Sequence, residues 1–467
     1  ARRSGIIDYE AVPPPNVKMV SDIIRENGYY ATNNSKTDYQ FEMSVMAWDE
    51  SSNNAHWKNR PNSNTPFFSI FNFGPTHEGN FFSNWDDEEF LVPEDSEINI
   101  PPYLPQNSVG ERDLKKVYSR IVKLDEWIGE KIKELEDEGL LEKTIVFFYS
   151  DHGGPLPRQK RLLYDSGLKV PLVIRFPDGE RAGKRDNRLV SFVDFPLTVL
   201  SLAGIEPPSF MQGQAFEGEY KSKSERKYIH GHADRFDESV DMIRAVRSKK
   251  FKYFKNFNPE KPYYLPLAFR ERLPSMQELL RMRDAGELDE YQALWFRKSK
   301  PEEELFDIEN DPHELNNIAN NPQYTEVLTA MREECISWMN VIDDKGLIEE
   351  KELIESFYPN RKARQTELPI IEISEKNVSV NELTDGSRLG YRYSSEKLPS
   401  KGWNHYNNPI DLKPNDTLEI IAHRIGYKSV LTKIYNGEKI SVEYPLSRIE
   451  IQDIRYSANR PKLPPIK

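Results

Sequence analysis

The sequence predicts an α/β protein in which helices cover both faces of a doubly wound, mostly parallel sheet. Two observations support this fold class. Helix-like and strand-like segments alternate along residues 17–204, and the strand-like segments are short apolar runs of the kind buried on both faces of a sheet. In such sheets the active site lies beyond the carboxyl ends of the strands, so polar loops that follow buried strands are candidate sites.

The N-terminal elements follow this alternation. A helix is predicted over residues 17–27, where apolar positions recur at helical spacing and Gly28 follows as a C-cap. A short strand is expected at residues 28–32. The run PFFSIFNFG, Pro66–Gly74, is rich in β-forming residues and ends in glycine, which predicts a buried strand that leads into a loop.

The next predicted elements repeat the pattern. A long amphipathic helix is expected over Arg112–Glu138, and the apolar run TIVFFYSDHGG after it predicts a fully buried strand with a polar loop at its carboxyl end. A strand at Val170–Pro177 and a helix closed by Gly204 complete this part. The loops after Phe73 and Tyr149 should therefore converge.

The pattern of apolar and turn-forming residues changes twice further along the chain. Residues 243–257 alternate in the manner of an antiparallel strand pair, and residues 325–339 predict an amphipathic helix. Later, short β-like pieces separated by Gly, Asn, Asp and Pro predict a β-sandwich-like module. The predicted domains are an α/β catalytic domain at 1–227, a small antiparallel α+β subdomain at 228–358 and the β-module at 359–467.

Composition excludes several functional classes. The net charge of −12 disfavours a nucleic-acid-binding protein, because neutralising phosphates requires clustered basic residues. No segment approaches the ~20 consecutive apolar residues that a membrane-spanning helix needs, and the first residues lack the apolar core of a signal peptide. Cys335 is the only cysteine, which rules out an intrachain disulfide or a cysteine-based zinc site.

The stretch Tyr149–Pro177 is the most informative about chemistry. Its strand delivers Asp151 and His152 into a glycine-rich loop, and this pair suits a divalent cation. The basic residues at 158, 160 and 161 follow closely, so several cations would surround one spot, as a bound dianion requires. From the spacing alone, a capped turn with solvated basic side chains explains the stretch equally well.

The same stretch resembles the metal-binding loop of sulfatases of the alkaline-phosphatase superfamily. In that family a strand ending in Ser-Asp-His-Gly is followed by Lys-x-x-Leu-Tyr-x-x-Gly-x-x-x-Pro. The matching residues here are Ser150, Asp151, His152, Gly153, Lys160, Leu163, Tyr164, Gly167 and Pro171. Other stretches agree in family order, among them VDFPLTVLSLAGIEPP and ELFDIENDPHELNNIA, so the resemblance runs to about residue 340. It implies an alkaline-phosphatase-like fold and a formylglycine-dependent sulfatase that acts on heparan-type or other polysaccharides.

The resemblance implies a role for each matching residue. Asp151 would be a Ca²⁺ ligand, and His152 would be the second ligand or its near neighbour. Lys160 would contact the sulfate and the departing oxygen. His77 matches the family's general acid, and an imidazolium near neutral pH can protonate an alkoxide as the S–O bond breaks. Without the resemblance, His77 is more simply interpreted as an ordinary loop histidine.

The other candidates match the family less closely. Lys36 occupies the place of a family lysine that grips sulfate, although Ser35 and Asp38 depart from the family's Gly-Lys-Trp-His pattern. The cluster HGHADRFDE has polar side chains that could line a substrate pocket, but at least half of them are expected to be ordinary loop residues. The candidates for substrate binding are Arg158, His230 and Arg235.

The sequence lacks a feature that the resemblance requires. Formylglycine is made from Cys or Ser in a Cys/Ser-x-Pro-x-Arg motif, which occurs nowhere in this chain. We therefore expect the first βα unit of the domain, with the nucleophile and two further metal carboxylates, to lie outside this sequence, and the chain alone to be inactive. One Asp and one His would hold Ca²⁺ weakly, because that ion prefers about six to eight oxygen ligands.

The resemblance also sets expectations about the substrate and its setting. It implies a sulfated polysaccharide or oligosaccharide as the substrate, Ca²⁺ as a cofactor and a periplasmic or extracellular location. Two alternatives remain open. One is a phosphodiesterase or phosphonate hydrolase of the same superfamily, and the other is a fragment that binds sulfated glycans without catalysis. The sequence predicts no oligomeric state.

Overall fold

The chain folds into two compact units, each assembled from separate stretches of sequence. The computed structural model describes residues 2–4, 7–9, 11–39, 41–83, 85, 90–93, 95–237, 239–396 and 402–445. The first unit comprises Ala1–Asn72, Ser191–Lys223 and Leu347–Lys467, and the second comprises Phe73–Val190 and Ser224–Gly346. The domain boundaries at residues 227 and 358 remain a prediction from the sequence pattern.

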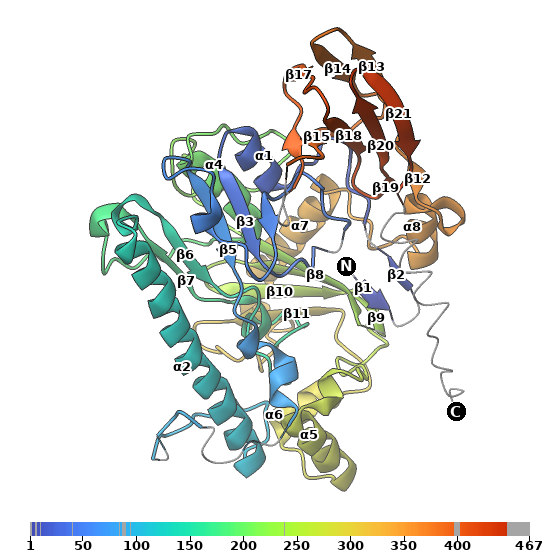
Figure 1. Cartoon of the computed structure of the whole chain (residues 1–467). Coiled ribbons are helices and arrows are strands. Elements are labelled where there is room, and N and C mark those ends of the chain that lie inside the picture. The colour runs from blue at the N-terminus through green and yellow to red at the C-terminus, as the bar shows by residue number, and fades with distance from the viewer. Residues whose placement is uncertain are drawn as a thin grey trace. The chain divides into compact units, whose positions relative to one another are not determined.

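A small parallel sheet forms the α/β part of the first unit. Its strands lie in the order β4-β3-β5, with Tyr30 opposite Phe67 in the register. Figure 1 shows β3 and β5 side by side. Two helices pack together through Ile23, Ile24 and Leu200. The bounds are α1 Val20–Glu26, β3 Tyr30–Asn34, β4 Glu50–Ser51, β5 Phe67–Phe71 and α4 Phe195–Leu202. The predicted parallel strand pairing and its flanking helices are thus present.

The end of the described chain forms an antiparallel β-module within the first unit. A five-stranded sheet, β16-β15-β18-β20-β21, and a three-stranded sheet, β13-β14-β17, share one apolar core that includes Val378 and Ile420. This arrangement agrees with the predicted sandwich-like module. The bounds are α8 Glu350–Phe357, β12 Arg364–Gln365, β13 Ile370–Ile373, β14 Asn377–Asn381, β15 Arg388–Tyr393, β16 Asn404–His405, β17 Ile410–Asp411, β18 Thr417–His423, β19 Tyr427–Lys428, β20 Val430–Tyr435 and β21 Glu438–Glu443, with β1 Arg2–Ser4 and β2 Ile7–Tyr9 near the N-terminus.

The second unit contains a four-stranded antiparallel sheet in the order β11-β10-β9-β8. The predicted strand pair at 243–257 corresponds to β9 and β10, and the predicted helix at 325–339 corresponds to α7. Cys335 of α7 is buried against this sheet beside Tyr253, where it packs as a small apolar residue. The bounds are β8 Ile229–Phe236, β9 Ser239–Arg247, β10 Phe251–Asn256, α5 Pro274–Ala285, α6 Glu290–Ala293, β11 Glu303–Asp307 and α7 Thr325–Val341.

The strand that leads to the candidate site differs from its prediction. Helix α2, Ser108–Asp137, precedes β6, Val146–Tyr149, as expected, but β6 pairs antiparallel with β7, Leu172–Arg175. The expectation of a fully buried strand is wrong, because among the described strands only β7 pairs with β6, and Tyr149 at the end of β6 is exposed. Among the described helices, none combines the length and apolar character needed to cross a membrane.

Candidate functional site

His77 and Lys160 meet inside the second unit. The Nζ atom of Lys160 lies 3.3 Å from Nε2 of His77. His77 ends the short turn that follows Phe73, and Lys160 lies in the loop between β6 and the one-turn helix α3, Asp165–Leu168. The two loops that the sequence predicted to converge therefore do so at a histidine and a lysine.

A backbone amide fixes the tautomer of the His77 ring. The N–H of Gly79 donates to Nδ1 of His77 at 3.2 Å, so the neutral ring carries its proton on Nε2. Nζ of Lys160 lies 3.3 Å from this Nε2 atom, so the two nitrogens offer hydrogen-bond donors at one place. An anionic oxygen is the group that accepts hydrogen bonds from two such donors at once.

Glu78 follows His77 in the chain and connects the two loops through its contacts with Lys160 and Arg161. Its carboxylate is 1% exposed, lies 2.9 Å from Nζ of Lys160, and accepts two hydrogen bonds from Arg161 at 2.8 and 2.9 Å. Burial alone would raise the pKa of Glu78, but hydrogen bonds and charges from Arg161 and Lys160 outweigh it and hold the pKa below its usual value. Glu78 is therefore a buried carboxylate anion that orients Lys160.

Close backbone packing shapes the loop that carries Lys160. The amide of Gly153 donates to the carbonyl of Gly167 at 2.8 Å, and the amide of Lys160 donates to the carbonyl of Gly154 at 3.0 Å. A Cβ atom on Gly167 would lie 2.3 Å from the carbonyl oxygen of Gln159. Glycine is required here because two backbone segments approach too closely for a side chain.

Substituting alanine for Gly167 should therefore destabilise the fold. We expect the free energy of unfolding to fall by about 1–3 kcal/mol, because backbone atoms must move to admit the methyl group. Gly129 is a matched control, since a Cβ there meets open space in the middle of α2. Gly129→Ala should stabilise the protein by ~0.5–1 kcal/mol. Urea unfolding of both variants checks this prediction. Equal effects of the two substitutions on the free energy of unfolding would contradict it.

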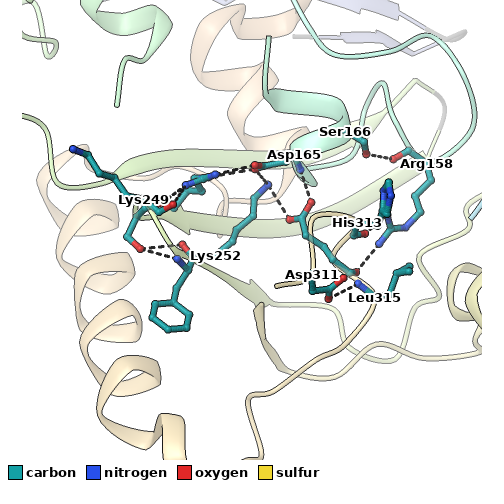
Figure 2. A network of polar contacts seen from close by, with 12 residues as sticks. Arg158, Asp165, Ser166, Lys249, Lys252, Asp311, His313 and Leu315 are labelled. Carbon is teal, nitrogen blue, oxygen red and sulfur yellow. Dashed lines mark hydrogen bonds and ion pairs between the residues drawn. The ribbon is translucent and has the colours of Figure 1, made fainter. Parts of the chain in front are cut away.

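Arg158 is a buried side chain in the loop that also carries Lys160. It is 4% exposed, and its guanidinium donates to the backbone carbonyls of His313 at 2.9 Å and Glu314 at 2.8 Å. The same group lies 3.7 Å from the ring centroid of Tyr164. Figure 2 shows the Arg158 side chain directed toward the segment that includes His313 and Leu315. These contacts anchor the loop, and the substrate-binding role of Arg158 remains a prediction from the sequence.

A buried ion network anchors the other end of the same loop. Nζ of Lys252 lies 2.8 Å from the carboxylate of Asp165 and 3.0 Å from that of Glu314, and Arg247 also pairs with Asp165 at 3.0 Å (Figure 2). Burial would raise the pKa of Asp165, but Lys252 and Arg247 lower it to about 2. The network ties the loop that carries Lys160 to strand β10.

A second buried carboxylate, Glu304, lines a small cavity beside Arg158 and Trp295. It is 1% exposed, and burial raises its pKa to about 8, against a weaker opposing hydrogen bond from Asn256. The folded protein therefore keeps Glu304 protonated near neutral pH, whereas the unfolded chain ionises it above its ordinary value of 4.5. The stability due to this group is complete below pH 4.5 and is lost as pH rises toward about 8.

Replacing Glu304 with glutamine should remove this pH dependence. We expect Glu304→Gln to be more stable than the parent by ~2–4 kcal/mol at pH 8 and nearly equal to it at pH 4. Glu303 is the control, because two hydrogen bonds from Arg332 lower its pKa. Glu303→Gln should therefore destabilise the protein at pH 8. Urea unfolding across this pH range tests both signs, and a Glu304→Gln variant less stable than the parent at pH 8 would contradict the assignment.

His230 packs between a strand and a helix, whereas Arg235 lies near Glu78. Nε2 of His230 lies 2.9 Å from Glu334, its ring stacks on Trp338 at 4.8 Å, and burial lowers its pKa. His230 thus joins β8 to α7 as a packing residue. Arg235 donates to the carbonyl of Asp237, whose carboxylate pairs with Arg161 at 2.8 Å, so Arg235 lies beside the Glu78 cluster.

Asp151 and His152 do not form a complete calcium site by themselves. Oδ1 of Asp151 lies 3.8 Å from Nε2 of His152, and Nδ1 of His152 lies 2.8 Å from the carbonyl of Gly153. Within the described ranges, no group of three or more His, Cys, Asp or Glu side chains could hold a metal. One carboxylate does not satisfy an ion that needs about six to eight oxygens.

Lys36 belongs to the first unit. It follows β3 in an exposed loop, where its ammonium lies 3.9 Å from Asp38 and its backbone amide donates to Asn72 at 2.9 Å. Its sulfate-binding role remains a prediction from the sequence.

Comparison with known proteins identifies the family. The sulfatase profile matches residues 16–205, and the profile for the C-terminal region of N-sulphoglucosamine sulphohydrolase matches residues 158–266. An ulvan-active sulfatase of Formosa agariphila is 47% identical over 462 residues, which cover 91% of this chain and 77% of the relative. The chain belongs to the sulfatase family. The predicted membership of the alkaline-phosphatase superfamily and the α/β fold class are thereby confirmed.

Other sulfatases match over shorter stretches. Human N-sulphoglucosamine sulphohydrolase is 26% identical over 273 residues, which cover 55% of this chain and 54% of the human protein. The solved structure of the Bacteroides fragilis sulfatase homologue yidJ superposes with a TM-score of 0.51 at 18% identity, covering 71% of this chain and 79% of that one. The last similarity supports the shared sulfatase fold.

Proposed function

We propose that the protein hydrolyses sulfate esters of a sulfated polysaccharide or oligosaccharide. One observation carries the proposal: Nζ of Lys160 lies 3.3 Å from Nε2 of His77, the ring nitrogen that bears the proton when Nδ1 accepts from Gly79. A sulfate ester presents anionic oxygens for the ammonium of Lys160 and a bridging oxygen for Nε2–H of His77. Membership of the sulfatase family supports the assignment of these roles.

The site residues would act together as the S–O bond breaks. Negative charge develops on the departing alcohol oxygen, and His77 would donate its Nε2 proton to that oxygen. Lys160, held by the buried carboxylate of Glu78, would stabilise charge on the sulfate without moving during the reaction. In sulfatases that use formylglycine, that residue supplies the nucleophile, and no residue of this chain takes that part.

Four finer assignments complete the proposal. Similarity to an ulvan-active sulfatase supports a polysaccharide substrate, and a polymer too large to cross a membrane favours a periplasmic or extracellular enzyme. Asp151 and His152 would contribute two ligands to a calcium site that other groups complete. Arg235, beside the Glu78 cluster, would contact the substrate.

Sulfate release from a sulfated oligosaccharide tests the proposed function. The assay uses a form of the protein that carries the formylglycine nucleophile, with an aryl phosphodiester and an aryl phosphonate as competing substrates. We expect sulfate to be released, and Lys160→Ala to reduce this release by about 10²–10³-fold. Faster turnover of the phosphorus esters would favour the alternative hydrolase, and glycan binding without any turnover would favour the non-catalytic alternative.

A further inference from the structure

We propose that Phe269 and Arg272 form a binding surface beside His77 for the sugar ring that carries the sulfate, and that this sugar belongs to an acidic saccharide. The inference rests on the proposed function and adds to it the chemical class of the leaving group. Both residues belong to the second unit, like His77 and Lys160.

Phe269 lies near His77, where the sugar that carries the sulfate would bind. Because His77 donates its proton to the sugar oxygen, the sugar ring has to lie against the imidazole. The ring centroid of Phe269 is 6.1 Å from that of His77, and its side chain is 36% exposed. An exposed aromatic face offers an apolar platform for the C–H face of a sugar. Phe82 supports the platform in a T-shaped contact at 4.9 Å.

Arg272 places a positive charge at the edge of this platform. Its guanidinium lies 4.3 Å from the ring centroid of Phe82 and 6.0 Å from that of Phe269, and the side chain is exposed. None of the ion pairs recorded between described residues includes Arg272. An exposed guanidinium beside aromatic rings suits a carboxylate or a second sulfate, because it can donate two parallel hydrogen bonds.

The neighbouring Arg270 holds this surface in a fixed conformation. Its side chain is 3% exposed, and it donates to the carbonyl of Leu265 at 2.6 Å. The guanidinium also lies 4.7 Å from the ring of Trp295 and 5.4 Å from that of Tyr264. Arg270 thus fixes the short turn that begins after Phe269 and carries Arg272.

Calorimetric titration of the chain with three probes tests the inference. The probes are inorganic sulfate, a monosulfated disaccharide with a uronic acid, and the same disaccharide with its carboxyl group reduced to an alcohol. Phe269→Ala should weaken binding of both disaccharides about tenfold and leave inorganic sulfate unaffected, whereas Phe269→Tyr should bind like the parent. Arg272→Gln should weaken only the uronic acid form, also by about tenfold.

Tyr291→Ala provides the control, because Tyr291 is an exposed aromatic residue on α6 of the same unit. It should leave all three affinities unchanged. If the form that carries the formylglycine nucleophile hydrolyses sulfated saccharides but Phe269→Ala and Arg272→Gln bind all probes normally, the surface is overturned and the proposed function stands. If that form neither binds nor hydrolyses any sulfated saccharide, both proposals are overturned.

Discussion

Replacing His77 with alanine should lower kcat for a sugar sulfate by about 10²–10⁴-fold, because the departing alkoxide would lose its proton donor. The loss should be much smaller for 4-nitrophenyl sulfate, whose phenolate leaves without protonation. Measuring kcat for both esters in the parent and in His77→Ala separates general-acid catalysis from substrate binding.

A matched substitution controls for a loss of activity that is caused by misfolding. His56→Ala changes a histidine in a short turn of the first unit, which the proposed chemistry does not use. It should leave kcat for both esters unchanged. An equal loss with both esters in His77→Ala would contradict the general-acid role and indicate a structural one.

Replacing Glu78 with leucine should have the largest effect on stability. The substitution leaves the buried charges of Lys160 and Arg161 without their carboxylate partner. Removing one member of a buried ion pair costs about 3–5 kcal/mol, because the remaining charge stays desolvated. Urea unfolding measures the loss, and sulfate release should fall with it because Lys160 loses its orientation.

Glu111→Leu is the control for this substitution. Glu111 pairs with Lys115 one turn along α2 at 2.8 Å, and its side chain is 45% exposed. Exposed pairs of this type contribute only about 0.3–0.5 kcal/mol. Comparable losses from Glu78→Leu and Glu111→Leu would show that the buried cluster does not hold the two loops together.

Much of the fold could be predicted because hydrophobic periodicity reports which face of an element is buried. The helices at 17–27 and 325–339 and the antiparallel pair at 243–257 follow from it directly. The same pattern cannot identify the partner of a strand. Strand β6 is apolar enough to suggest burial on both faces, yet in the part of the chain that the structure describes it pairs with β7 alone and ends in the exposed Tyr149.

The candidate site was predictable in part, for a related reason. His77 and Lys160 follow predicted strands, and loops that follow strands converge in folds of this class. Glu78 gave no signal, because a glutamate in a loop is normally solvated and its burial depends on Arg161, far away in the sequence. The anchoring contacts of Arg158 gave no signal either, because its partner carbonyl at Glu314 is 156 residues away.

The most direct test of the account is a double-mutant cycle on kcat/KM for a sugar sulfate, with His77→Ala, Lys160→Ala and the combined variant. If both side chains act on one sulfate ester group, each single variant loses at least about 10²-fold, and the double variant loses clearly less than the product of the two. Either single variant retaining the parent kcat/KM, or a double variant whose loss equals the product, would contradict the claim that His77 and Lys160 form one site.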